Sequence, residues 1–330
     1  MSPTATANVK LGYALSGEEH RPRDLIRSAA AAEDAGFEFA MISDHFHPWI
    51  DRQGQSVFVW SVLGGIAAAT SRLTVGTGVT CPTMRIHPAI LAQAAATTAD
   101  LLDGRFWFGV GTGENLNEHI LGQRWPTHEE RLSMLEEAID LIRRLWEGEI
   151  VSHRGEHYQV ANARIYTLPE TPPPILIAAS GPETAALAGR IGDGLIATGP
   201  KPELIRAFQR GSRRSRPLVA QVTICWAKSE AEARRTAHQW WPTAAMPGQS
   251  GQELPMPVHF EELATAVTED MVAEKITCGP DPEPHVEAIR KYVKAGFDHV
   301  YIHQVGPDQE GFLRFARRSL LPELERAIAA

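Results

Sequence analysis

Residues 36–49 read GFEFAMISDHFHPW and contain the unit from which this fold is built. Gly36 follows a helical run, where a C-terminal cap is expected, and the apolar run Phe39–Ser43 comes soon after it. A continuous apolar run without strict alternation is typical of a strand that is covered on both faces. Polar residues then occupy positions 44–47. This stretch predicts a buried strand that carries polar groups at its carboxyl end.

Short apolar runs alternate with amphipathic helical stretches along the whole chain, and the clearest helix pattern lies within Leu135–Trp146. Eight βα units in a chain of 330 residues predict an α/β fold, a single (β/α)8 TIM barrel over residues 1–330 with insertions. The predicted strands are Val9–Leu15, Phe39–Ser43, Leu73–Val79, Arg105–Gly111, Pro174–Ser180, Gly194–Gly199, Val219–Trp226 and His299–Val305.

A doubly wound dinucleotide-binding sheet is the competing interpretation. It requires the motif G-x-G-x-x-G after the first strand. The only near match, Gly109–Gly113, follows the fourth predicted strand, and Glu114 stands where the last glycine is needed. The barrel is therefore the better interpretation.

Two segments interrupt the alternation. Residues 149–170 alternate and turn like a hairpin, and residues 241–264 are rich in Pro, Gly and Gln and follow the seventh strand. Long βα segments of a barrel lie at its carboxyl-terminal mouth. We expect a hairpin-like insertion at 149–170 and a lid at 241–264.

Composition narrows the classes of function. The 32 basic and 40 acidic residues give a net charge of −8, which argues against a nucleic acid or an anionic membrane as partner. Three widely spaced cysteines indicate neither a disulfide framework nor a zinc site built from Cys. Apolar runs stay shorter than the ~20 residues of a membrane span, and the first residues lack the apolar region of a signal peptide. We expect a cytoplasmic enzyme that acts on a small molecule.

Polar side chains follow several predicted strands, and barrel enzymes place their catalytic groups at these points. A His, a carboxylate, an Asn, a Lys and a Trp would meet at one mouth, where they could bind a ligand and transfer protons. The polar strand ends are residues 44–49, 112–117, 180–183 and 198–201, with His303 and Gln304 after the last strand.

Each of these residues also has a purely structural interpretation. His45 beside Asp44 suits a hydrogen-bonded pair, and Trp49 suits an anchor for its loop. Glu114 suits the first turn of a helix, where an acid is favoured by the helix dipole. Ser180–Glu183 suits a helix cap, whose free N–H groups also attract anions. The functional interpretation therefore depends on their convergence.

The pair His45-x-His47 raises a metal-dependent hydrolase as an alternative, because imidazoles are zinc ligands. Such a site needs further His or Lys ligands on the middle strands and an Asp late in the barrel. The fourth to sixth strands end without His, and the eighth offers His303 without an Asp. We expect no metal.

Several motifs at matching spacing resemble the luciferase-like barrel oxidoreductases, and within them the deazaflavin-dependent group typified by a glucose-6-phosphate dehydrogenase that uses coenzyme F420. The resemblance runs nearly from end to end. The motifs are L-G-Y at 11–13, S-D-H-F-x-P-W at 43–49, P-T-x-R-x-x-P-A at 82–89, G-V-G-T-G-E-x-L-N-E at 109–118, W-P-x-x-x-E-R at 125–131, I-A-A-x-G-P at 177–182 and A-G-R-x-G-D-G at 188–194.

The resemblance implies a set of roles and a homodimer. It implies a cis peptide at Gly78–Val79 beneath the ring, with Gly78 where the typical member has Ser. The implied catalytic residues are His45, Glu114 and Trp49, with Glu18 as a further acid near that site. The implied cofactor-binding residues are Asp44, Gly78, Val79, Thr112, Gly113, Asn117, Ser180, Gly181 and Pro182.

For the substrate, the resemblance implies a sugar whose anomeric C–H gives a hydride to F420 while the hydroxyl proton leaves. Neutral His45 suits that proton near neutral pH, although the choice between His45 and Glu114 as base stays open. Thr198, Lys201 and, by a loose alignment, Lys275 match substrate-binding positions. The lid residues lack the family's third phosphate-binding lysine, so free and phosphorylated sugars both remain, and the polar lid favours a free sugar.

Other functions compete with this one. They are an F420-dependent alcohol dehydrogenase for secondary alcohols, an FMN-dependent monooxygenase of the same superfamily, and a catalytically silent protein that only binds the cofactor. The motifs favour the deazaflavin group over FMN, and the presence of both His45 and Glu114 argues against a silent binder.

Overall fold

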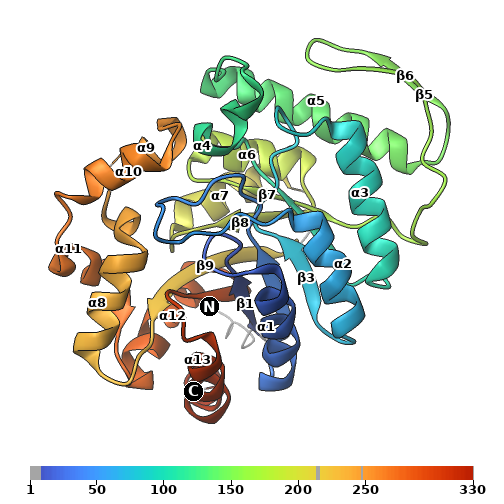
Figure 1. Cartoon of the computed structure of the whole chain (residues 1–330). Coiled ribbons are helices and arrows are strands. Elements are labelled where there is room, and N and C mark those ends of the chain that lie inside the picture. The colour runs from blue at the N-terminus through green and yellow to red at the C-terminus, as the bar shows by residue number, and fades with distance from the viewer. Residues whose placement is uncertain (1–8, 213–215, 247, 330) are drawn as a thin grey trace.

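A closed barrel of eight parallel strands, surrounded by helices, forms the centre of the molecule (Figure 1). The computed structural model describes residues 9–212, 216–246 and 248–329. Neighbouring strands follow the order β9-β11-β1-β2-β3-β4-β7-β8, and β8 pairs again with β9, which closes the barrel. The barrel strands are β1 (Lys10–Leu15), β2 (Phe39–Ile42), β3 (Thr74–Thr77), β4 (Phe106–Val110), β7 (Ile175–Ala178), β8 (Gly194–Ala197), β9 (Leu218–Cys225) and β11 (His299–Gln304).

The eight predicted strands are confirmed, and their ends differ from the prediction by at most two residues. Strand β2 shows why they read as continuous apolar runs. Phe39 and Met41 point into the barrel, whereas Ala40 and Ile42 join the core between the barrel and the helices. Both faces of the strand are therefore buried, as expected of a parallel sheet covered by helices. The remaining buried side chains of the interior are Leu176, Ile196, Val219 and Tyr301.

Helices cover the outside of the barrel, and glycines end two of them, one being Gly36 as predicted. Gly36 and Gly296 cap α1 and α12 with φ of 105° and 108°, the left-handed region that favours glycine. The outer helices are α1 (Pro22–Ala35), α2 (Val59–Ala69), α3 (Pro88–Leu101), α5 (His128–Trp146), α6 (Pro182–Ile191), α7 (Pro202–Gly211), α12 (Pro282–Ala295), α13 (Gln309–Phe315), the π-helical turn η3 (Ala316–Leu320) and α14 (Leu321–Ala329).

Residues 149–170 contain an antiparallel pair, β5 (Val151–Arg154) and β6 (Gln159–Ala163), which lies outside the barrel beyond α5 (Figure 1). Glu137 of α5 attaches this hairpin, because its carboxylate accepts hydrogen bonds from His157 N and Tyr158 N. The hairpin packs on the outer layer and reaches the loop after β3, because the Tyr158 hydroxyl donates to the Thr83 carbonyl at 3.0 Å.

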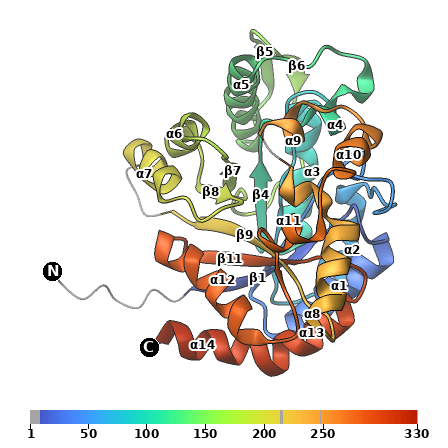
Figure 2. The same cartoon turned by 90° about the vertical axis from the view of Figure 1, so that its left-hand side faces the viewer.

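The described residues of 241–264 cover part of the barrel mouth; residue 247 of this segment lies outside the described residues. Figures 1 and 2 show α9 and α10 beside α4, and Asn115 Nδ2 donates a hydrogen bond to the Glu253 carbonyl at 2.9 Å. We call residues 241–264 the lid. The elements of this region are α4 (Asn115–Glu118), η1 (His119–Leu121), α8 (Glu230–Trp240), η2 (Pro242–Ala245), α9 (Ser250–Glu253), α10 (Pro257–Ala264), α11 (Glu269–Ala273) and β10 (Thr277–Cys278), which pairs with β9.

Within the described ranges, the structure contains no helix that is both long enough and apolar enough to cross a membrane.

Candidate active site

Three adjoining cavities open at the carboxyl ends of the strands. We call them the main cavity (about 300 Å³), the inner cavity (about 160 Å³) and the outer cavity (about 630 Å³). Trp49, Thr198 and Gln221 line all three, so the cavities are neighbours. The mouth of the barrel thus offers room for two ligands side by side, as a cofactor and a substrate would require.

His45 lies between two carboxylates where the main and inner cavities meet. Its Nε2 is 3.4 Å from Glu18 Oε1 and 3.4 Å from Glu114 Oε2. The His45 side chain is 11% exposed and that of Glu18 only 3%, so this interaction is shielded from water. The loops after β1, β2 and β4 each contribute one member. Barrel closure therefore brings together three residues that are far apart in the sequence.

The cluster shifts the proton affinity of each of its members. Burial alone would favour neutral imidazole, but Glu18 and then Glu114 outweigh it and raise the pKa of His45. Burial raises the pKa of Glu114, with a further contribution from the charge of Glu18. Burial opposes ionisation of Glu18 as well, yet His45 and the Ser43 hydroxyl lower its pKa. The imidazole therefore holds a proton more firmly than an ordinary histidine, and Glu18 is its counter-ion when it is protonated.

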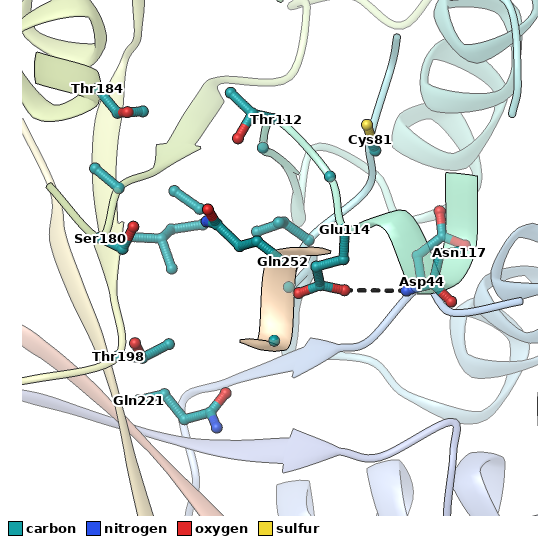
Figure 3. A pocket seen from close by; sticks show the side chains of 18 of the residues that line it. Asp44, Cys81, Thr112, Glu114, Asn117, Ser180, Thr184, Thr198, Gln221 and Gln252 are labelled. Atoms are coloured by element: carbon teal, nitrogen blue, oxygen red, sulfur yellow. Dashed lines mark hydrogen bonds between the residues drawn. The ribbon is translucent and has the colours of Figure 1, made fainter. Parts of the chain in front are cut away.

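Asn117 keeps this cluster in place. Its Oδ1 accepts hydrogen bonds from the backbone N–H groups of Phe46 (2.9 Å) and His47 (3.1 Å). Its Nδ2 donates to Glu114 Oε2 at 3.0 Å, the bond drawn in Figure 3, and lies 3.2 Å from His45 Nδ1. One buried amide thus orients the loop after β2, the acid and the imidazole. The resemblance implies that Asn117 contacts the cofactor; the geometry gives it this positioning task in addition.

Trp49 connects the cluster to the lid. Its ring lies 5.1 Å from the His45 ring and 5.3 Å from the Phe260 ring, centroid to centroid. Its backbone N–H donates to Gln53 Oε1, and Gln53 Nε2 donates to the Trp240 carbonyl. The indole is thus fixed from its own loop and from the lid, and it lines all three cavities.

Asp44 lies in a second buried group of charges beside the main cavity. Arg85 Nη2 donates to Asp44 Oδ1 at 2.8 Å, and the Thr80 hydroxyl donates to Asp44 Oδ2 at 2.8 Å. The backbone N–H of Arg85 also donates to Glu118 Oε2 at 2.9 Å. Burial raises the pKa of Glu118 to about 7, although Arg85 works against this. One guanidinium therefore faces two carboxylates, each 1% exposed.

Small residues leave the space that forms the floor of the main cavity. The Gly78–Val79 peptide is cis, as the resemblance implies, and both residues line the main cavity. Gly113 has φ of 79°, and a Cβ there would lie 2.5 Å from Cys81 Sγ. A side chain at position 113 would displace its neighbours, so glycine is required. Thr112 also lines this cavity. The cradle suits a flat heterocycle.

Uncharged residues line the opposite side of the cavity. Figure 3 shows Ser180, Thr184 and Thr198 across the pocket from Glu114 and Asn117. Gly181 caps α6 and Pro182 is its first residue, as the sequence predicts, but neither lines one of the three cavities. Their proposed contact with a cofactor lies at the edge of the main cavity, beside Ser180.

The structure places the two predicted substrate-binding lysines, Lys201 and Lys275, in different surroundings. Lys201 lines none of the three cavities, and its Nζ is 3.4 Å from the Ser180 carbonyl. Lys275 lines the outer cavity, together with Lys291 of α12. Neither Lys275 nor Lys291 is within salt-bridge distance of a carboxylate among the described residues, so both ammonium groups are available to a ligand.

Sequence reasoning missed several lining residues. Lys291 lies on a charged helix, where nothing in the sequence separates it from exposed neighbours. Gln221 did carry a signal, since it places an amide inside a mostly apolar strand. Tyr301 carried none, because its strand also contains His299 and His303. Further lining residues that were not predicted are Cys81, Glu118, His128, Thr184, Gly251 and Gln252.

The metal alternative gains no geometric support. His47 Nδ1 lies 2.8 Å from the Leu116 carbonyl rather than beside His45. Within the described residues, no group of three or more His, Cys, Asp or Glu side chains is arranged to hold a metal ion.

Fold and site together define a barrel enzyme with a histidine–carboxylate centre beside a glycine-lined cradle. The chain belongs to the luciferase-like monooxygenase family, whose sequence pattern matches residues 6–299. It is 38% identical over 328 residues to the F420-dependent glucose-6-phosphate dehydrogenase of Beutenbergia cavernae, covering 96% of this chain and 97% of that one. The enzyme of the same name from Nakamurella multipartita is 37% identical over 333 residues, covering 97% and 98%.

Solved structures give the same fold. An F420-dependent secondary alcohol dehydrogenase, in complex with an F420-acetone adduct, superposes with a TM-score of 0.89 at 29% identity, covering 96% of this chain and 99% of that one. A coenzyme F420-dependent tetrahydromethanopterin reductase from Methanopyrus kandleri has a TM-score of 0.78 at 22% identity, covering 96% and 100%, and supports the fold alone.

Proposed function

We propose that this protein is an F420-dependent dehydrogenase that oxidises a carbon bearing a hydroxyl, with the anomeric carbon of an aldose as its target. The observation that carries the proposal is the position of His45, which lies between Glu18 and Glu114 at the junction of the main and inner cavities. The relatives named for F420 and glucose 6-phosphate, matched along nearly their full length, support the same activity.

The main cavity fits coenzyme F420. The glycine cradle leaves room for its ring, and Asp44, Thr112 and Asn117 line the same cavity. Ser180 and the start of α6 would hold the phosphate-bearing tail, because helix N-termini attract anions. Bound there, F420 supplies a two-electron hydride acceptor.

The residues of the cluster transfer the proton of the reaction. The C–H bond of the substrate breaks and its electron pair leaves as hydride, while the O–H proton passes to neutral His45 and the C=O bond forms. For an aldose the product is a lactone. Glu18 and Glu114 stabilise the imidazolium that results, since both carboxylates lie 3.4 Å from Nε2. Glu114 is the alternative proton acceptor, because its pKa is also raised.

The outer cavity bears on the choice between free and phosphorylated sugars. Lys201 lies outside the cavities and the described lid residues bring no cation, which favours a free sugar. Lys275 and Lys291 supply two ammonium groups and favour an anionic end. A double Lys275→Ala, Lys291→Ala variant separates these cases. If kcat/KM for glucose 6-phosphate falls while that for glucose stays constant, the anionic substrate is the preferred one.

A secondary alcohol dehydrogenase is the second candidate function. It is favoured by the structural similarity to the enzyme of that name and by the small inner cavity of about 160 Å³. Turnover of 2-propanol with no turnover of any aldose would replace the first proposal by this one.

Spectroscopic titration tests the cofactor first. F420 and FMN have different chromophores, so absorbance and fluorescence report which of them binds. Reduction of F420 is then followed with aldoses, aldose 6-phosphates and secondary alcohols. Binding of FMN alone would reject the proposal, and so would the absence of F420 reduction with every substrate.

We further propose that the chain forms a cytoplasmic homodimer. Three apolar side chains near α2 and α3 support a protein contact there, since Phe58, Ile90 and Leu101 are 58%, 58% and 55% exposed. Light scattering gives the mass in solution, and a monomer would reject the dimer.

A further inference from the structure

Tyr301 brings a phenol hydroxyl into the barrel interior. It belongs to β11, is 2% exposed, and lines both the main and the inner cavity. Its ring packs edge-on against Phe39, with centroids 6.3 Å apart, inside the apolar cluster of the barrel. The ring is therefore held by its neighbours, and its hydroxyl lies at the junction of the two cavities.

The Tyr301 hydroxyl has no hydrogen-bond partner among the described residues. Because Tyr301 lines two cavities, a ligand bound there can supply the missing acceptor or donor. Burial raises the pKa of Tyr301, so the phenol stays neutral and keeps its proton. The hydroxyl is thus a donor that faces the space where a substrate would bind.

Gly78 lies beside this hydroxyl. A Cβ at position 78 would lie 3.6 Å from Tyr301 Oη and 3.1 Å from Met41 Cβ. A serine there, as in the typical family member, would place its own oxygen near the phenol. Gly78 and Tyr301 are therefore neighbours, and a glycine at position 78 leaves the phenol without a second hydroxyl beside it.

We propose that Tyr301 is a specificity-determining residue that donates a hydrogen bond to a second oxygen of the substrate, next to the reacting carbon. This proposal rests on the proposed function. An aldose carries such a second oxygen, whereas a simple secondary alcohol lacks it. The inner cavity is small and also holds Glu18 and His45, so one substrate can reach the cluster and the phenol together.

The variant Tyr301→Phe removes only this hydroxyl and keeps the ring. We expect kcat/KM for the best aldose to fall about tenfold, which corresponds to about 1.4 kcal/mol. We expect kcat/KM for 2-propanol to change less than about twofold, and F420 affinity to stay constant. An equal change for both substrates, or none for either, would overturn the proposal.

Calorimetry with the cofactor-free protein gives a readout that does not depend on turnover. Tyr301→Phe is expected to weaken binding of the aldose about tenfold. An inactive wild-type enzyme that still binds an aldose through Tyr301 would reject the proposed function and keep this assignment. Failure of the aldose to bind the wild-type protein, with and without F420, would reject the assignment.

The matched control is Tyr13→Phe. Tyr13 is also a buried barrel tyrosine, but its hydroxyl donates to Gln309 Oε1 and it lines none of the three cavities. It should lower thermal stability and leave the ratio of aldose to 2-propanol unchanged.

A double-mutant cycle tests the pair. Gly78→Ser should reduce aldose turnover more in the wild-type background than in Tyr301→Phe, because the serine hydroxyl would lie near the phenol and could take up its hydrogen bond. Additive effects of the two changes would contradict the pairing.

Discussion

The two sides of the barrel mouth are built on different principles. On one side, after β1, β2 and β4, Glu18, His45, Glu114 and Asn117 form a charged wall in which each polar group already has a protein partner. On the other side, Ser180, Thr184, Thr198 and Gln221 form a neutral wall (Figure 3). Among the described residues, the only hydrogen bond from a side chain of the neutral wall is a long one of 3.4 Å between Gln221 and Thr223.

This difference assigns proton transfer to the charged wall and ligand binding to the neutral wall. Charges that are buried must be paired before a ligand arrives, so the charged wall is rigid and holds its proton at a fixed place. Hydroxyl and amide groups lose less when their partner is water, so the neutral wall can leave its donors free for a ligand. We therefore expect changes in the charged wall to affect turnover, and changes in the neutral wall to affect affinity.

The largest expected effect comes from His45→Ala. Removal of the imidazole eliminates the proton acceptor, and we expect kcat to fall by about a thousandfold. F420 affinity, measured by fluorescence titration, should stay within about twofold of the wild type. His119→Ala, a nearby histidine that lines none of the three cavities, is the control. Turnover retained in the His45 variant would remove it from the mechanism.

Arg85→Met tests whether the buried carboxylates of Asp44 and Glu118 also need a charged partner for the protein to be stable. It leaves Asp44 and Glu118 buried without their counter-ion, and we expect the free energy of unfolding to fall by roughly 3 kcal/mol in urea denaturation. Arg314→Met, which removes an exposed partner of Glu310, should change stability by less than about 1 kcal/mol. Equal effects of the two variants would contradict the importance of burial.

A smaller effect is expected on the pH dependence. Neutral His45 is the proposed base, so kcat/KM should rise with pH, with a midpoint above the ordinary histidine value because Glu18 and Glu114 raise its pKa. Glu18→Gln removes one of these charges, and we expect the midpoint to move down by about one pH unit. The exposed Glu203→Gln should not move it. A midpoint that stays in place in Glu18→Gln would argue against both His45 and Glu114 as the base, since the charge of Glu18 raises the pKa of each.

The smallest effect is expected on the neutral wall. Thr198 lines all three cavities. The variant Thr198→Val keeps the shape of its side chain and removes its hydroxyl. We expect KM to rise about fivefold with kcat unchanged within about twofold. Thr265→Val, in the exposed turn after α10, is the control. If kcat falls and KM does not, the separation of the two walls is wrong.

Much of the fold could be predicted because the strands are buried on both faces. Strand β2, Phe39–Ile42, shows this, since its inward and outward side chains are all apolar. Strands that are too short to show a pattern of buried residues could not be predicted. Strand β10 contains only Thr277 and Cys278, and it pairs with β9 through backbone groups that no sequence pattern marks.

The candidate site was predictable where a residue follows directly after a strand. His45, Trp49 and Glu114 were found in this way, and the structure places all three around one cavity. Lys201 was expected there too, but it lines none of the three cavities, and its Nζ lies 3.4 Å from the Ser180 carbonyl. Lys291 was not predicted because helix α12 reaches the outer cavity through packing alone.

The sequence by itself determined the alternation of buried strands and capped helices, because burial on two faces and helix termination are local requirements on residue type. It also determined which polar groups stand at the carboxyl ends of the strands. Only the tertiary structure decided that two carboxylates face one imidazole, that Gly78 lies beside the Tyr301 hydroxyl, and that two lysines face the outer cavity. These depend on distances between segments far apart in the chain, and such distances are set by barrel closure and by the packing of the lid.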